Sequence, residues 1–290
     1  MIKDKDLLVV VGHAMRMPWT DILYRGQCQT WLKDYATSNF HILHIYGNPP
    51  NKVLRKFEKI DEIIRLNFSY INFIRKLYLN PIYFWMHRKQ IYTKATKLQS
   101  TNMPALEISI IDINPLVMFK ILTTLEWFVN TTDYTHMYVT TTSSYLRYNK
   151  LKQHLNNIKS PLDFCGTILK HDGINFISGA NRLFSRNIAE QILINKEKLD
   201  LFIPEDVAIS NLVRSLGYSF IDLPTKNIDS EQKLSELSSA DLKNNFHFRL
   251  KSTGSLRAFN MVNATYDEKV KRNDVTLMHM LHERFSKITD

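Results

Sequence analysis

The sequence predicts an α/β fold in which helices flank a mostly parallel central sheet, and three observations support this. Short apolar runs such as residues 7–11 and 137–140 have the length and β-branched content of buried parallel strands. Amphipathic segments that suit helices separate these runs, as strand–helix–strand units require. With 290 residues, the chain is long enough to bury a large core. Ligands of such folds bind at the carboxyl ends of the strands.

The first part of the chain begins with the strand 7–11, which ends at the turn Gly12-His13. A second strand at 40–46 stops at Gly47-Asn48-Pro49-Pro50, where glycine and proline disfavour further pairing. The other elements expected here are a helical segment at 18–34, a helix at 52–62, short strands at 63–66 and 108–113, and a helix at 115–130.

Residues 70–106 depart from this alternation, and we expect a helical insertion there. Between residues 70 and 100, aromatic side chains interleave with arginine, lysine and histidine, which is typical of a helix lying in a membrane interface. The alternative, which we favour, is a helical hairpin broken at Asn80-Pro81, whose aromatic side chains pack on the core while its cations face solvent.

In the second part, the segment from Phe176 predicts a strand that ends in a small turn, Ser178-Gly179-Ala180, before a helix start. We expect residues 1–260 to form one domain and residues 261–290 a helical extension. The remaining expected elements are a strand at 163–169, helices at 148–157, 207–216 and 267–287, and a polar loop at 227–239.

The net charge of +10 favours anionic partners, namely nucleic acid, an anionic membrane or a nucleotide-activated substrate. The basic residues are spread out and form no nucleic-acid module, so we expect no nucleic-acid partner. Two cysteines, Cys28 and Cys165, make no disulfide framework, which favours a reducing compartment. No signal-like run or apolar stretch of about 20 residues is present, so we expect a cytoplasmic protein, with peripheral membrane contact left open.

An acidic pair, Glu205 and Asp206, follows Pro204 and precedes the apolar-periodic run 207–216. Acidic side chains at a helix start interact favourably with the helix dipole, so the pair can be structural. A carboxylate in a cleft can also act as a general base. The sequence by itself leaves both roles open.

Four segments resemble, in the same order, the GT-A glycosyltransferases of the fringe and β-1,3-galactosyltransferase type. Residues 25–31 resemble that family's Arg-x-x-x-Arg-x-Thr-Trp helix, one residue shorter and with Gln29 in place of the second arginine. Residues 119–127 resemble its Lys-Thr-x-x-x-x-x-Trp helix, with Ile121 in place of the threonine. Residues 176–185 resemble its Ser-Gly-x-x-x-x-x-Ser segment, and residues 204–207 with Leu216-Gly217 resemble its Glu-Asp-Val motif. The resemblance covers roughly residues 7–224.

The resemblance implies a GT-A fold and a site made of these segments. It places the catalytic base of an inverting transferase on Asp206, with Glu205 sharing that role or orienting the acceptor. It also implies contacts of the nucleotide with Gly12, His13 and Arg25, and of the donor sugar and acceptor with Ser178 and Gly179. For each of these contact residues, an ordinary turn or helix-surface role is the alternative.

The sequence departs from the family where its metal-binding Asp-x-Asp motif would stand, because Thr141, Thr142 and Ser143 occupy those positions. Uncharged hydroxyls are poor ligands for a hard divalent cation, so we expect no metal and no other cofactor. The resemblance implies that these hydroxyls would lie beside the ribose and diphosphate. Either cations of the protein replace the metal, or the site is inactive.

A basic segment late in the chain bears on this choice. His247, Arg249 and Lys251 alternate, so they share one face if the segment is extended. Such a face can bind the two phosphates of a nucleotide sugar. The alternative is an edge strand whose cations only discourage aggregation.

The sequence therefore predicts an inverting glycosyltransferase. Its partners would be a nucleotide-diphosphate sugar and a saccharide or lipid-linked acceptor in the synthesis of surface polysaccharide or lipopolysaccharide. A catalytically silent module that binds a glycan or a nucleotide is the alternative. A basic, membrane-associated protein that acts through residues 70–100 is a third hypothesis.

Overall fold

The computed structural model describes residues 2–15, 18–35, 41–49, 52, 56, 91–98, 101–110, 117–171, 173–201, 203–250, 259–260, 265–266 and 272–288. Its centre is an eight-stranded sheet with the order β3-β4-β2-β1-β5-β8-β7-β9. These strands are β1 (Leu7–Ala14), β2 (His41–Gly47), β3 (Thr93–Lys97), β4 (Pro104–Ile108), β5 (His136–Thr141), β7 (Phe164–His171), β8 (Ile174–Ser185) and β9 (Ile221–Asp222).

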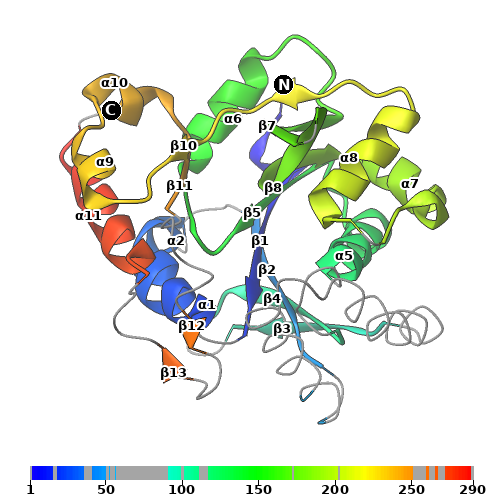
Figure 1. Ribbon diagram of the computed structural model, residues 1–290, viewed down its shortest axis with the longest axis horizontal. Helices are drawn as coiled ribbons and strands as arrows, with labels where there is room; N and C mark the ends of the chain where they lie inside the picture. Colours follow the sequence, from blue (N-terminus) through cyan, green and yellow to red (C-terminus); the bar gives the residue numbers. More distant parts are fainter. Residues whose placement is uncertain are drawn as a thin grey trace.

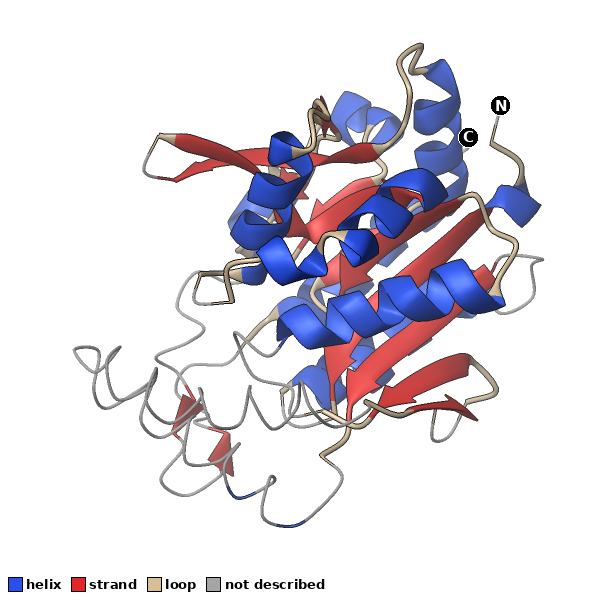
Figure 2. Cartoon of the chain, turned by 90° about the vertical axis from the view of Figure 1, so that its right-hand side faces the viewer, coloured by secondary structure: helices blue, strands red, loops and turns tan. Residues whose placement is uncertain are grey.

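The middle of this sheet, β4-β2-β1-β5, is parallel. On one side of it β3 runs antiparallel to β4, and on the other β8 runs antiparallel to β5 and β7. Figures 1 and 2 show helices on both faces of the sheet. This is the fold class that the sequence predicted. A smaller sheet, β10-β11-β6, and a two-stranded sheet, β12-β13, complete the strands: β6 (Ser144–Leu146), β10 (Lys226–Asn227), β11 (His247–Arg249), β12 (Phe259–Asn260) and β13 (Thr265–Tyr266).

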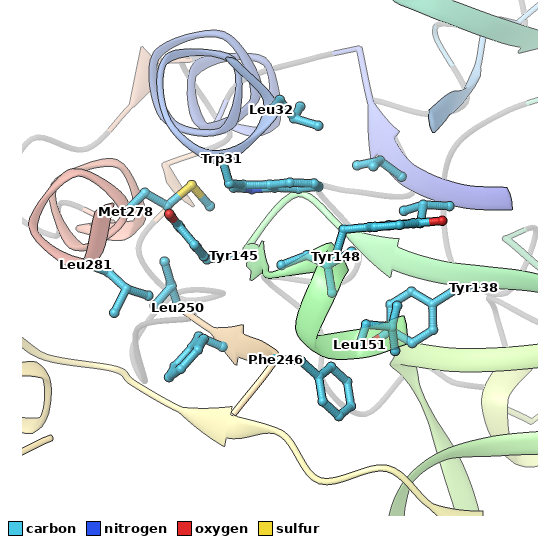
Figure 3. Packing of buried hydrophobic residues seen from close by; sticks show 14 of the residues in the cluster. Trp31, Leu32, Tyr138, Tyr145, Tyr148, Leu151, Phe246, Leu250, Met278 and Leu281 are labelled. Carbon is cyan, nitrogen blue, oxygen red and sulfur yellow. The ribbon is translucent and has the colours of Figure 1, made fainter. Parts of the chain in front are cut away.

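The core forms two layers because alternate residues of a strand face opposite sides of the sheet. Leu8 and Val10 of β1 face the layer that contains α5 (Val117–Thr131), α7 (Arg186–Ile194) and α8 (Glu205–Ser215). Leu7, Val9 and Val11 face the other layer, shown in part in Figure 3, where Trp31, Tyr148 and Leu281 pack together. That layer contains α2 (Trp31–Tyr35), α6 (Tyr148–Asn157), α9 (Glu231–Ser235), α10 (Ser239–Asn244) and α11 (Asp274–Ser286).

Several predicted elements are confirmed with shifted or equal bounds. The helix expected at 148–157 has these bounds, and the helix expected at 115–130 is α5. The C-terminal helix expected at 267–287 is α11, whose buried side chains belong to the same core layer as those of α2 and α6. No helix among the described residues has the length and apolar character needed to cross a membrane.

The turn predicted at Ser178-Gly179-Ala180 is wrong, because β8 continues through it to Ser185. Residues 178–180 lie in the bulge of the ladder with β7 and before the ladder with β5, which begins at Asn181. Pairing of residues 174–177 with β7 and of residues 181–185 with β5 keeps the strand extended across the small residues. The following helix, α7, begins only after Ser185, whose Oγ accepts the N–H of Ile188 at 3.1 Å and so caps the helix.

Other boundaries also differ from expectation. The strand expected at 108–113 lies earlier, as β4, and the last part of the expected helical insertion is the strand pair β3-β4 rather than helix. Residues 70–90 of that insertion lie outside the described residues, as does the strand expected at 63–66 and nearly all of the helix at 52–62. The polar segment 227–239 contains α9 and the start of α10, each with a serine N-cap, Ser230 and Ser238.

The single helical segment expected at 18–34 is divided into four parts. Thr30 has a non-helical backbone, with φ −121° and ψ −118°, and this interrupts the helix there. The parts are α1 (Trp19–Asp21), the π-helix η2 (Ile22–Gly26), the 3-10 helix η3 (Gln27–Gln29) and α2; two further 3-10 turns are η1 (Asp4–Asp6) and η4 (Lys196–Lys198).

Candidate functional site

The carboxyl ends of β1 and β5 lie side by side and begin the site. Gly12 of β1 is the register partner of Thr141 of β5, after which the chain turns through Thr142 and Ser143 into β6. Strand β11 pairs with β6, so Arg249 lies opposite Ser144, and the N–H of Leu250 donates to the carbonyl of Ser143 at 2.7 Å. The fold thus brings the first strand end, the hydroxyl turn and the late basic segment together.

The acidic pair lies at the start of α8, against the middle of β8. Asp206 is half-buried, and its Oδ2 accepts the backbone N–H of Gly179 at 3.2 Å. Its Oδ1 accepts the N–H of Val207 at 3.0 Å. Gly179 can donate here because the ladder with β5 ends at Asn181 and that with β7 has a bulge.

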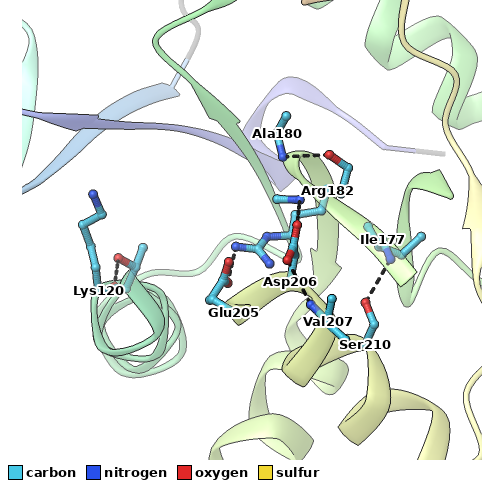
Figure 4. A network of polar contacts seen from close by, with 11 residues as sticks. Lys120, Ile177, Ala180, Arg182, Glu205, Asp206, Val207 and Ser210 are labelled. Carbon is cyan, nitrogen blue, oxygen red and sulfur yellow. Dashed lines mark hydrogen bonds and ion pairs between the residues drawn. The ribbon is translucent and has the colours of Figure 1, made fainter. Parts of the chain in front are cut away.

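Glu205 is buried in an ion pair with Arg182 of β8, whose Nη2 donates to Glu205 Oε1 (Figure 4). Burial raises the pKa of Glu205 above its usual value, and the neighbouring Arg182 opposes that rise. Asp206 is the more exposed of the two carboxylates, and each of its oxygens can accept a further hydrogen bond besides the one from a backbone N–H.

Two arginines lie near the hydroxyl turn. Arg249 is half-buried, its Nε has no hydrogen-bond partner among the described residues, and burial lowers its pKa while the charge of Asp206 opposes this. Arg272 donates from Nη2 to Ser143 Oγ at 2.8 Å and to Asp274 Oδ1 at 2.7 Å. Its guanidinium carbon lies 4.4 Å from the ring centroid of Trp19.

A third cation, Lys120, lies near the end of β1. It comes from α5, which belongs to the core layer that contains α7 and α8. Its Nζ donates to the carbonyl of His13 at 3.3 Å, although the residue is only 6% exposed. Lys120 also helps to lower the pKa of Glu205, so it lies on the side of the acidic pair. Figure 4 shows Lys120 across from Glu205 and Arg182.

The two predicted histidines are buried and uncharged. Burial, together with His44 and Lys120, lowers the pKa of His13, whose ring lies 5.6 Å from that of His44. Burial lowers the pKa of His247 to about 3, and its Nδ1 lies 2.6 Å from the hydroxyl of Tyr138. Of the three residues predicted to share a cationic face, Arg249 therefore carries the charge, and Lys251 lies outside the described residues.

Two other predicted residues make local contacts. The side chain of Arg25 is 74% exposed and pairs with Asp21 on its own helical segment, so the structure does not bring it to the site. Ser178 is buried and its Oγ accepts the N–H of Ala180 at 3.2 Å, next to Gly179.

Sequence reasoning missed Lys120, Arg182 and Arg272. The first two lie inside segments that carried the resemblance, residues 119–127 and 176–185, so their place near the site could have been anticipated. Arg272 comes from the expected C-terminal extension, and no local pattern connects it with Ser143, 129 residues away.

No group of three His, Cys, Asp or Glu side chains that could hold a metal ion occurs in the part of the chain that the structure describes. A pocket of about 670 Å³ lies at the opposite, amino ends of the strands, where Leu8, His41 and Pro104 line it. None of the predicted site residues borders this pocket.

No family model and no curated protein matches the chain. Among solved structures, the galactosyltransferase LgtC in complex with donor and acceptor sugar analogues is 8% identical, with 98% of each chain covered and a TM-score of 0.48. A glycosyltransferase involved in glycosylation of the major capsid of PBCV-1 is 9% identical, covering 89% of this chain and 98% of that one, with a TM-score of 0.42. Mouse xyloside xylosyltransferase 1 is 7% identical over 84% and 97% of the chains, with a TM-score of 0.40. At such values, function has to be argued from this chain's own residues.

Proposed function

We propose that the protein is an inverting glycosyltransferase that moves a sugar from a nucleotide-diphosphate donor to a hydroxyl of a saccharide or lipid-linked acceptor. One observation carries the proposal. The half-buried Asp206, bound to the N–H of Gly179, and the half-buried Arg249, opposite Ser144, belong to the edge where the hydroxyl turn 141–143 lies, and the charge of Asp206 opposes the lowering of the Arg249 pKa. A base and a phosphate-binding cation are the two groups that such a transfer needs.

Asp206 is the proposed general base. It takes the proton of the acceptor hydroxyl while the acceptor oxygen attacks the anomeric carbon of the donor sugar. The bond from that carbon to the diphosphate oxygen breaks, and its electron pair leaves with the nucleoside diphosphate. One displacement inverts the anomeric configuration. The N–H of Gly179, which binds Oδ2, keeps the carboxylate oriented toward the acceptor side.

Cations of the protein are proposed to bind the diphosphate. The residues at the hydroxyl turn do not fit a divalent ion. Ser143 Oγ accepts a hydrogen bond from the guanidinium of Arg272, and the other two positions are threonines, whose uncharged hydroxyls are poor ligands for such an ion. Arg249 and Arg272 would stabilise the charge of the departing diphosphate through charge-assisted hydrogen bonds. Thr141 and Thr142 can donate further hydrogen bonds to the donor.

The proposal extends to the acceptor and its pathway. A net charge of +10 favours a phosphate-bearing acceptor, such as a lipid-linked saccharide at a membrane surface. We propose the synthesis of surface polysaccharide or lipopolysaccharide at the cytoplasmic face, where such acceptors are built, with the protein held peripherally by its positive charge.

Nucleoside diphosphate release from a panel of sugar nucleotides, each with manganese and with a chelator, tests the proposal. We expect release from one donor to persist in chelator. Release only with manganese would contradict the role given to the arginines. A donor that binds in calorimetry but releases no diphosphate, even with phosphorylated lipid-linked acceptors present, would favour the silent binding module.

The role of Asp206 is tested by Asp206→Asn, which keeps the side-chain shape. We expect turnover to fall by about 10² to 10⁴-fold, the usual contribution of a general base, while the circular dichroism spectrum stays unchanged. Glu190→Gln, an exposed acidic position on α7, is the matched control and should keep full turnover. Full activity of Asp206→Asn would remove Asp206 from the mechanism.

A further inference from the structure

Arg182 is a fully buried arginine in the middle of β8, with 1% of its side chain exposed. Its Nη2 donates to Glu205 Oε1, whereas Nε and Nη1 have no hydrogen-bond partner among the described residues. Its guanidinium also lies over the ring of Phe184, 5.3 Å from the centroid. A buried pair of this kind contributes little net stability compared with apolar residues, which indicates that it serves another purpose.

Besides the contact that Arg214 makes at the far end of α8, three contacts join β8 to α8 in order along both elements. Ile177 donates its N–H to Ser210 Oγ at 2.9 Å, Gly179 donates to Asp206 Oδ2 at 3.2 Å, and Arg182 binds Glu205. The helix start lies directly over Gly179, since a Cβ added there would be 3.6 Å from both Asp206 Cβ and Glu205 Oε2. The Arg182 contact is the last of the three and reaches Glu205, the first residue of α8.

We propose that Arg182 is a positioning residue, which acts through Glu205 to hold Asp206 against the N–H of Gly179. Pro204, the residue before α8, provides no side-chain cap for the helix. Instead, the charge-assisted hydrogen bond from Arg182 to Glu205 holds the start of the helix in place. Glu205 then orients the base instead of sharing its chemistry. The inference rests on the proposed function only for its effect on turnover, because the position of Asp206 can be measured without turnover.

The first test is NMR of protein labelled with ¹⁵N-glycine, in which only eight glycines give signals. The Gly179 signal is assigned by its loss in Gly179→Ala. Its chemical shift reports the hydrogen bond to Asp206 Oδ2 and should change in Asp206→Asn, which weakens that acceptor. We expect Arg182→Met to displace this signal, and Glu205→Gln to displace it to a smaller extent.

Arg214→Met is the matched control. Arg214 also joins α8 to β8, by donating to the carbonyl of Asn175, but it is exposed and lies at the far end of the helix. It should leave the Gly179 signal as in the wild type. A Gly179 signal that stays in place in Arg182→Met would overturn the inference. If Arg182→Met does not fold, Arg182→Lys serves instead, since it keeps the charge but loses the fork that reaches Glu205.

The second test uses turnover of whichever donor the wild type accepts. Arg182→Lys should lower kcat by about 10 to 100-fold with little change in the donor KM, because the base and not the diphosphate site is displaced. An unchanged kcat beside a displaced Gly179 signal would overturn the catalytic part of the inference. Failure of the wild type to turn over any donor would count against the proposed function, while the NMR result would still decide the role of Arg182.

Discussion

The two buried arginine pairs of the site, Arg182–Glu205 and Arg272–Asp274, differ in how well their hydrogen bonds are satisfied. All four side chains are at most 9% exposed. Arg272 donates to both carboxylate oxygens of Asp274 and to Ser143, and it stacks on Trp19. Arg182 binds one oxygen of Glu205 and leaves two nitrogens without a partner in the described part of the chain.

The two pairs also differ in the parts of the chain that they connect. The partners of the first pair are two residues apart, so the pair forms locally and ties the segment before α11 to the hydroxyl turn. The partners of the second are 23 residues apart and join a strand to a helix start. Burial of a pair costs free energy unless its remaining donors are satisfied. The Arg182–Glu205 pair therefore has the larger burial cost that hydrogen bonds do not offset, and removal of either partner should cost more stability.

The largest effect is expected for Arg182→Met. Removing this guanidinium leaves Glu205 as a buried carboxylate without its main partner, which should cost about 3 to 5 kcal/mol of the free energy of unfolding at pH 7. Urea denaturation followed by circular dichroism measures this. Lys287→Met, which breaks an exposed pair with Glu283, is the control and should leave the urea midpoint unchanged. A loss as small as that of the control would mean that the Arg182–Glu205 pair does not hold β8 and α8 together.

A smaller loss is expected for Arg272→Met, roughly 2 to 3 kcal/mol. Asp274 and Glu205 are each the first residue of a helix, so both helix starts partly compensate the charge, but Glu205 also lies beside the like-charged Asp206, which adds to the cost of leaving it unpaired. The same urea experiment measures the loss, and the comparison predicts that it is smaller than that of Arg182→Met. The reverse order would mean that the number of satisfied hydrogen bonds does not rank the two pairs.

Gly166→Ala tests the strand that supports Arg182. A Cβ at Gly166 would lie 2.4 Å from the carbonyl oxygen of Asn181 and 3.2 Å from Arg182 Cα, so β7 and β8 must move apart. We expect a loss of about 1 to 3 kcal/mol, as for overpacking, together with a displaced Gly179 amide signal. Gly217→Asn, at a positive φ of 88°, strains the backbone at a cost of about 1 kcal/mol, but it lies away from β7 and should leave the Gly179 amide signal in place. A Gly179 signal that stays in place in Gly166→Ala would mean that the strand holds Arg182 more loosely than described.

The sequence indicated the strands and helices whose signals are local, such as β1 and α6, and it named the acidic pair at the start of α8. It could not separate the roles of Glu205 and Asp206, because the difference lies in Arg182 on another element. The turn expected at Ser178-Gly179-Ala180 failed for a similar reason, since the residues on both sides of it pair with neighbouring strands and the N–H of Gly179 binds Asp206 of another element. Long-range register, rather than residue type, determined what was missed.

The pH dependence of Arg182→Met gives the smallest and most specific test. The pKa of Glu205 is already raised by burial from its ordinary value of 4.5, and loss of Arg182 removes an interaction that lowers it. Because the pKa of Glu205 is higher in the folded state than in the unfolded chain, the folded state binds this proton more tightly. Stability therefore rises as the pH falls through the folded pKa, and the stability lost at high pH is fully regained below 4.5. The deficit of Arg182→Met relative to the wild type should therefore shrink between pH 7 and pH 5, by at most about 1.4 kcal/mol per pH unit for one proton. Urea midpoints at the two pH values measure it, and the double variant Arg182→Met with Glu205→Gln, which lacks the titrating group, should lose this pH dependence. A deficit that stays constant in the single variant would mean that Glu205 finds another cation, and Lys120, which already lowers its pKa, is the residue to replace next.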